Sequence, residues 1–331
     1  MKKNLNEENT KNICIIGLGQ IGSRHFQALL NCDFYVNILC VDLNDDSISK
    51  AKSLIPKKLS KYIKSVNYLN DIESLPKEID LAILATSADI RIKVLHSLLN
   101  YSKTENIIFE KILFQNSSNF DEASAILRKA GTKSWVNCPR RSWPVYKELK
   151  DYIHGKEKVS LNLYGGKWGL ACNSIHFIDL FEWLTESKVK KINSSALDPD
   201  ICDNKREGFV EFSGKLEVSY DKRNKVTLIS DKKNDDANFE INLSGPDFNI
   251  EIKESLGTFK LEDENKIVSK EFTLPYQSEL TNLFAKEIIY RNTSVLPTFC
   301  ESLNQHKPMI EAFHRHFEKI TKKKVEYCPI T

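Results

Sequence analysis

Three glycines near the N-terminus limit what this chain can fold into more than any other feature. Gly17, Gly19 and Gly22 follow a short apolar run at residues 13–16 and precede a segment with helical spacing at residues 23–30. The spacing G-x-G-x-x-G between a strand and a helix is typical of the first turn of a dinucleotide-binding fold. A glycine-rich turn that binds no ligand is the alternative interpretation.

Each position of the turn has a physical reason. Gly17 permits the tight turn, Gly19 lets the backbone approach a pyrophosphate, and Gly22 lets helix and strand pack closely. The N–H groups at the start of the helix, at Gln20 and Ile21, have no partner within the helix and point toward that phosphate. We therefore predict that a phosphate-bearing cofactor binds at this end of the helix.

Asp42 is a second, independent signal. It lies 20 residues after Gly22, at the end of the next strand-like segment. A carboxylate there accepts hydrogen bonds from the adenosine ribose and repels a 2′-phosphate. No arginine directly follows Asp42, so the sequence favours NAD over NADP. FAD would fit the same glycine spacing, but we see no second flavin-type feature.

The first 139 residues alternate between apolar runs and amphipathic segments. Helical spacing follows most of the runs, which lie at residues 13–16, 34–41, 81–85, 107–109 and 135–138. Apolar runs that alternate with helices indicate a parallel sheet covered on both faces. The prediction for residues 1–139 is therefore a doubly wound Rossmann domain of the α/β class.

The pattern changes near Pro139. After one further helix at residues 145–154, alternating segments typical of strands predominate. They lie at residues 158–164, 210–220, 225–229, 239–243, 248–252 and 267–274, and helices are expected at residues 173–185, 278–291 and 302–319. We predict an α+β domain over residues 140–331, built on an open, mostly antiparallel sheet that binds substrate and forms the oligomer.

Composition excludes several classes of protein. The chain has 331 residues with 48 basic and 45 acidic side chains, a balance that indicates no nucleic-acid or membrane partner. No apolar run approaches the length of a membrane span, and the N-terminus lacks the apolar region of a secretory signal, so we expect it to be a short frayed lead-in. Eight scattered cysteines with no C-x-x-C pair indicate reduced thiols in a cytoplasmic protein.

Four further motifs carry a resemblance to a known family. In chain order they are ILATSADIR at residues 83–91, IFEKILF at 108–114, RRSWPVYKEL at 140–149 and NSIHFIDLFEWL at 173–184. Over essentially the whole chain this order resembles the glucose–fructose oxidoreductase / inositol dehydrogenase family, Gfo/Idh/MocA. The resemblance implies a Rossmann domain followed by an open antiparallel sheet, an active site between them, and NAD or NADP hydride chemistry on sugars, cyclitols or their derivatives.

The resemblance also implies cofactor-side residues in the first domain. The family signature is Glu-Lys-Pro after a sheet strand, and its proline usually follows a cis or strained peptide near the nicotinamide. Glu110 and Lys111 match the signature, whereas Ile112 replaces the proline. The family's Thr-Pro turn corresponds to Thr86 and Ser87 here. These residues are therefore expected beside the cofactor, and Lys111 is expected to be catalytic.

In the second domain the resemblance points to one helix. The family carries Asp-x-x-x-His there; His176 matches the histidine, and Cys172 stands in place of the aspartate. Asn173 is polar and adjacent, so it is a candidate to contact substrate. Arg141 matches the family's arginine before the crossover proline. Cys172 and His176 are spaced for one helix face, but two ligands do not make a metal site, and we predict none.

Oxidation of a secondary alcohol needs a proton acceptor and a group that stabilises charge on oxygen. Lys111, at a strand end, fits the polariser or proton carrier. An imidazole ordinarily titrates near neutral pH, so His176 suits the base. Asp179 either orients His176 or pairs locally. Trp168 either stacks on a sugar or covers the sheet.

Three basic side chains bear on the substrate class. Lys167, Arg140 and Arg141 either bind a phosphate or carboxylate of the substrate or form a solvated rim. The first reading would make a nucleotide-activated or acidic sugar a subclass of substrate. The leading prediction is an NAD(P)-dependent dehydrogenase or reductase acting on a sugar-like substrate.

Two other functions fit the same sequence, and the chain is predicted to form a homo-oligomer. One rival is a regulatory protein of the same fold that binds NAD(H) or a sugar without turnover. The other is an enzyme that recycles a tightly held cofactor, giving net isomerisation or epimerisation. Apolar side chains offer surface for a homodimer or homotetramer through the C-terminal sheet, namely Phe209, Phe212, Leu216, Val218, Phe239 and Ile241.

Overall fold

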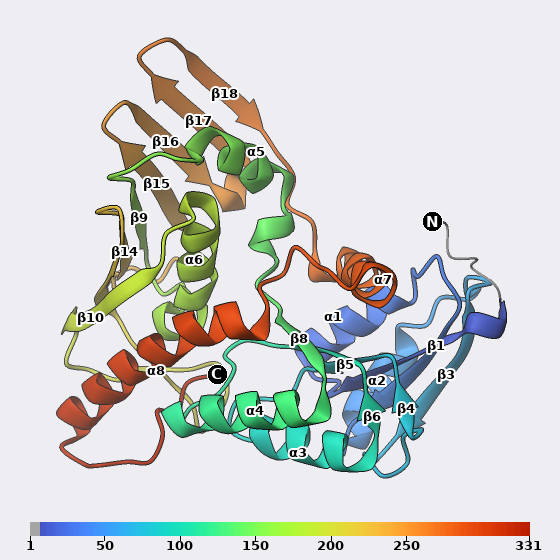
Figure 1. The fold of residues 1–331 in the computed structure, drawn as a ribbon. Helices are drawn as coiled ribbons and strands as arrows, with labels where there is room; N and C mark the ends of the chain where they lie inside the picture. Colours follow the sequence, from blue (N-terminus) through green and yellow to red (C-terminus); the bar gives the residue numbers. More distant parts are fainter. Residues whose placement is uncertain (1–6) are drawn as a thin grey trace. The chain divides into compact units, whose positions relative to one another are not determined.

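A computed structural model describes residues 7–331, which form two compact units (Figure 1). The first unit contains the chain up to Phe114, Ser118–Pro139 and Pro275–Cys300; the second contains Gln115–Ser117, Arg140–Leu274 and Glu301–Thr331. Of the N-terminal lead-in, residues 1–6 lie outside the described part. Residues Glu7–Asn9 form a short 3₁₀ helix, η1, and Lys11 begins the first strand.

The first unit is built on a six-stranded parallel sheet with the order β3-β2-β1-β5-β7-β8. The middle strands are apolar and buried because helices cover the sheet, as the sequence predicts for a doubly wound fold. The strands are β1 Lys11–Ile16, β2 Val36–Val41, β3 Ile63–Leu69, β5 Leu81–Leu84, β7 Asn106–Phe109 and β8 Lys133–Val136. The helices of this unit are α1 Gln20–Leu29, α2 Asp45–Ser53, α3 Arg91–Tyr101, α4 Ser117–Ala130 and α7 Thr281–Arg291.

The order of the strands reverses between β1 and β5. From β1 the chain continues outward to β2 and β3, and it then returns to β5 on the other side of β1. In an open α/β sheet, ligands bind at the carboxyl ends of the strands where this reversal occurs. The glycine turn follows β1, so the fold places it at that point.

One segment belongs to a different unit from the one predicted. The units divide between Pro139 and Arg140, where the sequence places the boundary, but Pro275–Cys300 lies in the first unit. This segment holds the 3₁₀ helix η4 Gln277–Glu279 and α7, which pack on α1 through buried residues such as Phe284 and Ile288. Sequence periodicity shows that α7 has an apolar face but not which unit that face covers.

The second unit is built on an eight-stranded sheet with the order β10-β13-β14-β9-β15-β16-β17-β18. All neighbouring strands pair antiparallel except β14 and β9, which are parallel. The strands are β9 Ser160–Gly165, β10 Val189–Leu197, β13 Gly214–Tyr220, β14 Lys225–Ser230, β15 Phe239–Gly245, β16 Phe248–Lys253, β17 Thr258–Asp263 and β18 Ile267–Glu271. This arrangement confirms the predicted fold class.

Helix α6, Leu170–Thr185, lies against one face of this sheet (Figure 1). Most of its residues are buried, because apolar side chains continue around the helix rather than along a single stripe. The other helices of the second unit are α5 Pro144–Ile153 and most of α8 Phe299–Thr321, with 3₁₀ turns η2 Pro139–Ser142 and η3 Glu254–Leu256. Two-stranded pairs join β4 Glu78–Ile79 to β6 Lys103–Thr104, and β11 Cys202–Asp203 to β12 Val210–Glu211.

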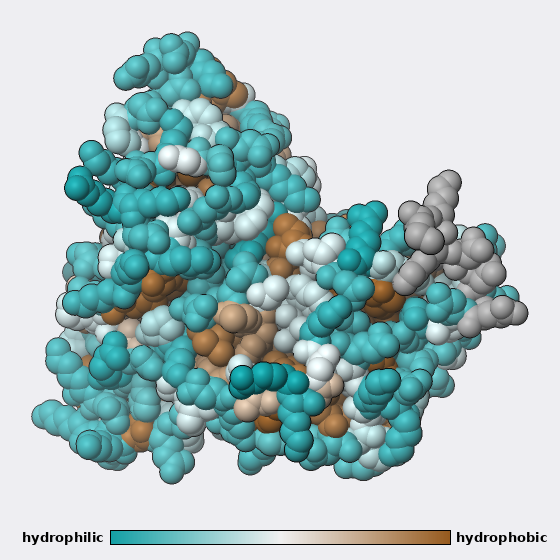
Figure 2. Space-filling view, viewed as in Figure 1, coloured by the Kyte–Doolittle hydropathy of each residue, from teal (hydrophilic) through white to brown (hydrophobic). Residues whose placement is uncertain are grey.

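The apolar residues assigned to an oligomer interface do not form an exposed patch. Phe212, Leu216, Val218 and Ile241 are each about 1% exposed or less, and the ring of Phe239 packs against Trp168 and Phe177. They face the interior because alternation along a strand directs the apolar set toward the covering helix. The opposite face of the sheet carries polar side chains such as Asn162, Glu217 and Glu251. In the view of Figure 2, hydrophilic side chains cover most of the surface.

Six of the described strands were not predicted: β3, β10 and β17, and the two-residue strands β4, β6 and β11. In β10 only two of the nine residues are buried, so its sequence carries no apolar run. No helix among residues 7–331 combines the length and apolar character needed to cross a membrane. All eight cysteines are free thiols.

Candidate functional site

The glycine turn has the backbone geometry that its spacing predicts. Gly17 has a φ of +95°, and a Cβ added there would lie 3.0 Å from the backbone of Ala85 and Thr86 in the loop after β5. A Cβ on Gly22 would lie 1.9 Å from the Gly17 carbonyl oxygen. Both glycines are therefore required by contacts within the first unit itself, whether or not a ligand binds.

Gly19 differs from the other two glycines. A Cβ added there would meet no atom within 4 Å, and its φ of −60° suits any residue. Gly19 is the N-cap of α1, yet no side chain caps the helix and its first turn holds no acidic residue. The free space at Gly19 and the uncapped start of α1, at Gln20 and Ile21, fit an anionic group such as a pyrophosphate.

Asp42 is fixed beside the glycine turn. Its Oδ2 accepts a hydrogen bond of 2.6 Å from the Leu18 N–H, and its Oδ1 accepts one of 2.8 Å from the Asn44 N–H. The side chain is half-buried, and each carboxylate oxygen has a second lone-pair site. Asp42 thus retains capacity to accept hydrogen bonds from ribose hydroxyls.

Thr86 and Ser87 lie on the loop that follows β5, on the other side of β1. Both residues are partly exposed. Thr86 Oγ1 is itself buried and has no hydrogen-bond partner among the described residues. A buried hydroxyl without a partner is uncommon in native proteins, so this group fits a bound ligand or an ordered water.

Glu110 points into the first unit rather than to its surface. The side chain is 4% exposed, and Oε1 accepts hydrogen bonds from His25 Nε2 at 2.8 Å and Asn137 Nδ2 at 2.5 Å. Burial acts to raise the pKa of Glu110, but the bonds and charges of its neighbours, His25 first among them, hold that pKa below its usual value. A direct contact between Glu110 and a cofactor therefore gains no support from its position.

Lys111 follows Glu110 at the end of β7 and is partly exposed. The Lys111–Ile112 peptide is cis, although no proline follows Lys111. The family resemblance links this position to a cis or strained peptide, and the geometry is present here without the proline.

A hydrogen-bond network around His25 was not predicted from the sequence. The imidazole is fully buried; its Nδ1 hydrogen-bonds Thr281 Oγ1 at 2.8 Å, while Asn137 Nδ2 also donates to Gln277 Oε1 at 3.0 Å. Thr281 and Gln277 come from the late segment that rejoins the first unit. The available signal was the position of His25 three residues after Gly22, on the buried face of α1.

Arg91 was also missed. It is 1% exposed, and its guanidinium donates to the carbonyl oxygens of Thr86, Ile112 and Leu113. Arg91 therefore connects the loop after β5 to the loop after β7, the two loops that carry the predicted cofactor-side residues. A charged residue at the start of α3 gives no sequence signal of these distant backbone partners.

In the second unit, three of the predicted site residues lie on the partly exposed part of α6. Among its 16 residues only Cys172, Asn173, His176 and Trp183 are not buried. Residues three or four apart are neighbours on a helix surface, so His176 lies beside both Cys172 and Asn173, and the three form one patch. Asn173 Nδ2 donates to the Trp168 carbonyl at 2.7 Å, which fixes its side chain at the start of the helix.

Arg141 and Asp179 form a buried ion pair in the second unit. Arg141 Nη2 lies 2.6 Å from Asp179 Oδ1, and its Nε lies 2.9 Å from Oδ2, a bidentate arrangement. Burial raises the pKa of Asp179 to about 6 against the opposing effect of the Arg141 charge. Asp179 therefore pairs locally, and the substrate role predicted for Arg141 gains no support from these contacts.

Arg140, Lys167 and Trp168 also bond to partners within the second unit. Arg140 binds both carboxylate oxygens of Glu254, at 2.9 and 2.8 Å, and Lys167 lies 2.5 Å from Asp235. Trp168 is 5% exposed, and its indole N–H donates to the Ile229 carbonyl at 2.9 Å. Its ring packs with two phenylalanines, so its position favours covering the sheet over stacking on a sugar.

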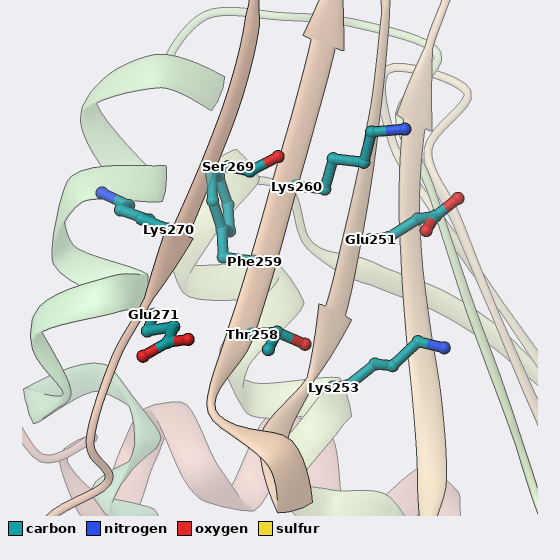
Figure 3. A pocket seen from close by; sticks show the side chains of 8 residues that line it. All are labelled: Glu251, Lys253, Thr258, Phe259, Lys260, Ser269, Lys270 and Glu271. Carbon is teal, nitrogen blue, oxygen red and sulfur yellow. The ribbon is translucent and has the colours of Figure 1, made fainter.

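A hollow of about 450 Å³ lies on β16, β17 and β18 (Figure 3). Its lysines are paired with carboxylates: Lys253 with Glu240, and Lys260 with Glu262 at 2.6 Å each. None of the predicted site residues lines it. No group of three metal-ligating side chains lies close enough to hold an ion in the described part of the chain.

One family model matches most of the first unit. Residues 11–138 match a family described as "Oxidoreductase family, NAD-binding Rossmann fold". A search of curated proteins by sequence finds no match. The family match thus covers the glycine turn, Asp42, Thr86 and Lys111.

Solved structures share the fold of almost the whole chain. UDP-N-acetylglucosamine 3-dehydrogenase GnnA from Acidithiobacillus ferrooxidans is 11% identical with a TM-score of 0.69, covering 92% of this chain and 95% of that one. Scyllo-inositol dehydrogenase from Lactobacillus casei, with NAD(H) and scyllo-inositol bound, is 16% identical with a TM-score of 0.66, covering 94% and 98%. A super-repressor mutant of Gal80p from Saccharomyces cerevisiae is 14% identical with a TM-score of 0.69, covering 94% and 96%.

Proposed function

We propose that this chain is an NAD-dependent dehydrogenase or reductase of the Gfo/Idh/MocA family, because residues 11–138 match that family's NAD-binding Rossmann domain. Its substrate is the secondary alcohol or ketone of a sugar or sugar derivative. Two structurally similar proteins, named for UDP-N-acetylglucosamine and scyllo-inositol, support this substrate class. The basic side chains that suggested an acidic sugar are paired with carboxylates, so the proposal specifies no acidic group.

The observation that carries the proposal is the open space at Gly19. Gly17 and Gly22 are explained by contacts within the protein, but Gly19 is not, and the helix N–H groups behind it have no side-chain cap. A dinucleotide pyrophosphate accounts for all three features together. Leu43, 86% exposed directly after Asp42, offers an apolar surface to the adenine end of such a ligand.

Asp42 favours NAD in this proposal. Its carboxylate is held by two backbone N–H groups and would repel the 2′-phosphate of NADP. No arginine follows it to compensate that repulsion. A measured preference for NADP in turnover would contradict this part of the proposal.

We assign catalytic roles to Lys111 and His176. NAD supplies the hydride acceptor when it is bound. Lys111 stabilises the developing charge on the substrate oxygen through its ammonium group. His176 accepts the hydroxyl proton, and Asn173 and Cys172, which share its patch on α6, orient the substrate.

Enzyme kinetics on purified protein test this assignment. NADH binding is measured by fluorescence, and turnover is followed by NADH absorbance over a panel of keto-sugars and cyclitol ketones. We expect Lys111→Met and His176→Asn each to lower kcat by about 10²–10⁴-fold without abolishing NADH binding. Lys50→Met and His96→Asn are matched controls on exposed helix surfaces and should leave kcat unchanged. Retention of most turnover by Lys111→Met would remove Lys111 from the mechanism.

A regulatory protein that binds NAD(H) or a sugar is the second candidate function. The shared fold with the Gal80p super-repressor mutant is the observation that favours it. Tight NADH binding with no turnover across the whole panel would select this function over the dehydrogenase.

We also propose a cytoplasmic location and a homodimer or homotetramer. The eight free thiols support a reducing compartment. Four of the six apolar residues first assigned to the interface are buried, so no contact residues are specified. Light scattering tests the oligomer, and a monomeric mass would contradict it.

A further inference from the structure

Glu211 brings a carboxylate to the start of α6 from a distant part of the sequence. Its Oε1 accepts hydrogen bonds from the backbone N–H groups of Ala171 and, at 3.0 Å, of Phe212. Its Oε2 accepts one of 3.3 Å from the Cys172 N–H. Glu211 lies on β12, about 40 residues further along the chain, and is 9% exposed.

This carboxylate occupies a place that α6 itself cannot fill. The N-cap is Gly169, with a φ of +81°, so no side chain of the N-cap satisfies the first N–H groups, and the first turn holds no acidic residue. A negative charge is favourable at the N-terminus of a helix. Glu211 therefore caps α6 from outside and supplies the charge that its first turn lacks.

The same carboxylate lies near the Cys172 thiol, whose Sγ donates to the Gly169 carbonyl oxygen at 3.5 Å. A Cβ added at Gly169 would lie 2.8 Å from Cys172 Sγ and 3.4 Å from Glu211 Oε2, so the two groups flank one point. Burial raises the pKa of Glu211, and its contacts with the Phe212 and Ala171 N–H groups and with Cys172 oppose that rise. Cys172 belongs to the exposed patch with Asn173 and His176, and Glu211 therefore places an acid beside that patch.

We propose that Glu211 and Cys172 form a thiol–carboxylate pair in which Glu211 is the acidic positioning residue of the α6 site. Glu211 fixes the first turn of α6 and keeps a negative charge at Cys172, one helical turn before His176. The effect of Glu211 on turnover rests on the proposed function, whereas the pairing of Glu211 with Cys172 does not depend on it. The sequence places cysteine where the resembled family has aspartate, and the structure supplies the carboxylate from β12 instead.

Thiol alkylation tests the pair without cofactor or substrate. A neighbouring carboxylate disfavours the thiolate, which is the form that reacts with iodoacetamide. At pH 7.5 we expect Glu211→Gln to raise the alkylation rate of Cys172 by about three- to tenfold. Glu211→Asp keeps the charge and should stay near the wild-type rate. Peptide mass spectrometry follows Cys172, and exposed Cys300 in the same digest is the internal reference.

An unchanged Cys172 rate in folded Glu211→Gln would overturn the pair. If Glu211→Gln does not fold, Glu211→Asp and Cys172→Ser are measured in its place. The pair predicts that Glu211→Asp alkylates Cys172 at the wild-type rate and that Cys172→Ser, which keeps a donor, retains the wild-type Tm. An accelerated rate in Glu211→Asp would overturn it.

Turnover tests the positioning role on the substrate that the panel identifies. We expect Glu211→Gln to lower kcat by about tenfold or more with KM for NADH unchanged, because the cofactor residues lie in the other unit. The double variant Glu211→Gln/Cys172→Asp returns a carboxylate to the same point and should recover most of kcat. If Glu211 only stabilised the helix as a cap, Glu211→Gln would lower Tm without this loss and recovery of kcat. Failure of the double variant to recover kcat would overturn the positioning role of Glu211. Glu217→Gln, on the partly exposed strand β13, is the control.

Absence of turnover in the wild-type protein is a separate result. It would overturn the proposed dehydrogenase, and the Cys172 alkylation rates would still decide whether the pair exists.

Discussion

Glu110 in the first unit and Asp179 in the second unit are both buried carboxylates, and each bonds to one basic side chain. Their pKa values nevertheless move in opposite directions. Burial acts to raise both, but Glu110 accepts hydrogen bonds from two side chains and lies near the Lys111 charge, so its pKa is lowered. Asp179 has the Arg141 guanidinium, but the carboxylates of Glu301 and Glu182 lie nearby, and its pKa rises to about 6.

The difference shows how the two units hold their functional segments. In the first unit, donors collect around one acid and fix the end of β7 next to Lys111. In the second unit, two carboxylates, those of Asp179 and Glu301, pair with the buried Arg141. The first arrangement stabilises Glu110 as an ionised carboxylate at neutral pH. In the second, the charge of Arg141 is the main interaction that favours the ionised form of Asp179.

The largest expected effect is loss of the buried arginine. Arg141→Met leaves Asp179 buried without its partner, so we expect the free energy of unfolding to fall by about 3–5 kcal/mol. Chemical denaturation measures this change. Lys286→Met, which breaks an exposed pair with Asp33, is the control and should cost less than about 1 kcal/mol. A stable Arg141→Met protein with a raised substrate KM would instead make Arg141 a substrate residue.

The glycines of the first unit should separate stability from binding. Gly22→Ala drives a methyl group into the Gly17 carbonyl and should cost about 3 kcal/mol of stability. Gly19→Ala meets no protein atom, so we expect a stability change below about 1 kcal/mol but an NADH affinity about tenfold weaker. Denaturation and fluorescence titration measure the two quantities. Equal NADH affinity in wild type and Gly19→Ala would remove the pyrophosphate from this position.

The pH dependence of stability should have opposite signs for the two acids. The folded pKa of Asp179 is raised from 3.8 to about 6, so its contribution is complete at low pH and is lost as pH rises through about 6. The advantage of wild type over Asp179→Asn should thus shrink by about 1–2 kcal/mol between pH 4 and 7. Because the pKa of Glu110 is lowered from 4.5, its contribution is present above about pH 4.5 and is lost on acidification.

Denaturation curves collected from pH 3 to pH 8 measure both slopes. The advantage of wild type over Glu110→Gln should shrink as pH falls below 4.5. Equal pH slopes for the two variants would contradict the opposite pKa shifts of Glu110 and Asp179.

The smallest effect is expected at an exposed pair of the second unit. Lys167 and Asp235 are more than half exposed, so Lys167→Ala should change Tm by less than about 1 °C. Substrate KM should also stay the same, since the lysine already has a carboxylate partner. A KM raised tenfold would restore Lys167 as a residue that binds an anionic group of the substrate.

The success of sequence reasoning differed between the units for a physical reason. The glycine turn and Asp42 were recognised because a strand, a tight turn and a helix N-terminus impose local spacing on the chain. The polar contacts of the second unit join residues about 40 positions apart, as with Glu211 and Ala171 or Arg141 and Asp179. Periodicity contains no information about which distant side chain completes such a contact.

The amino-acid sequence by itself determined the doubly wound first domain, the mostly antiparallel second sheet and the dinucleotide turn. Only the tertiary structure decided that Pro275–Cys300 returns to the first unit, that the apolar side chains of the second sheet face inward, and that Glu211 reaches α6. Local propensity and spacing fix elements one at a time. Burial and hydrogen-bond satisfaction are settled only when distant elements pack together.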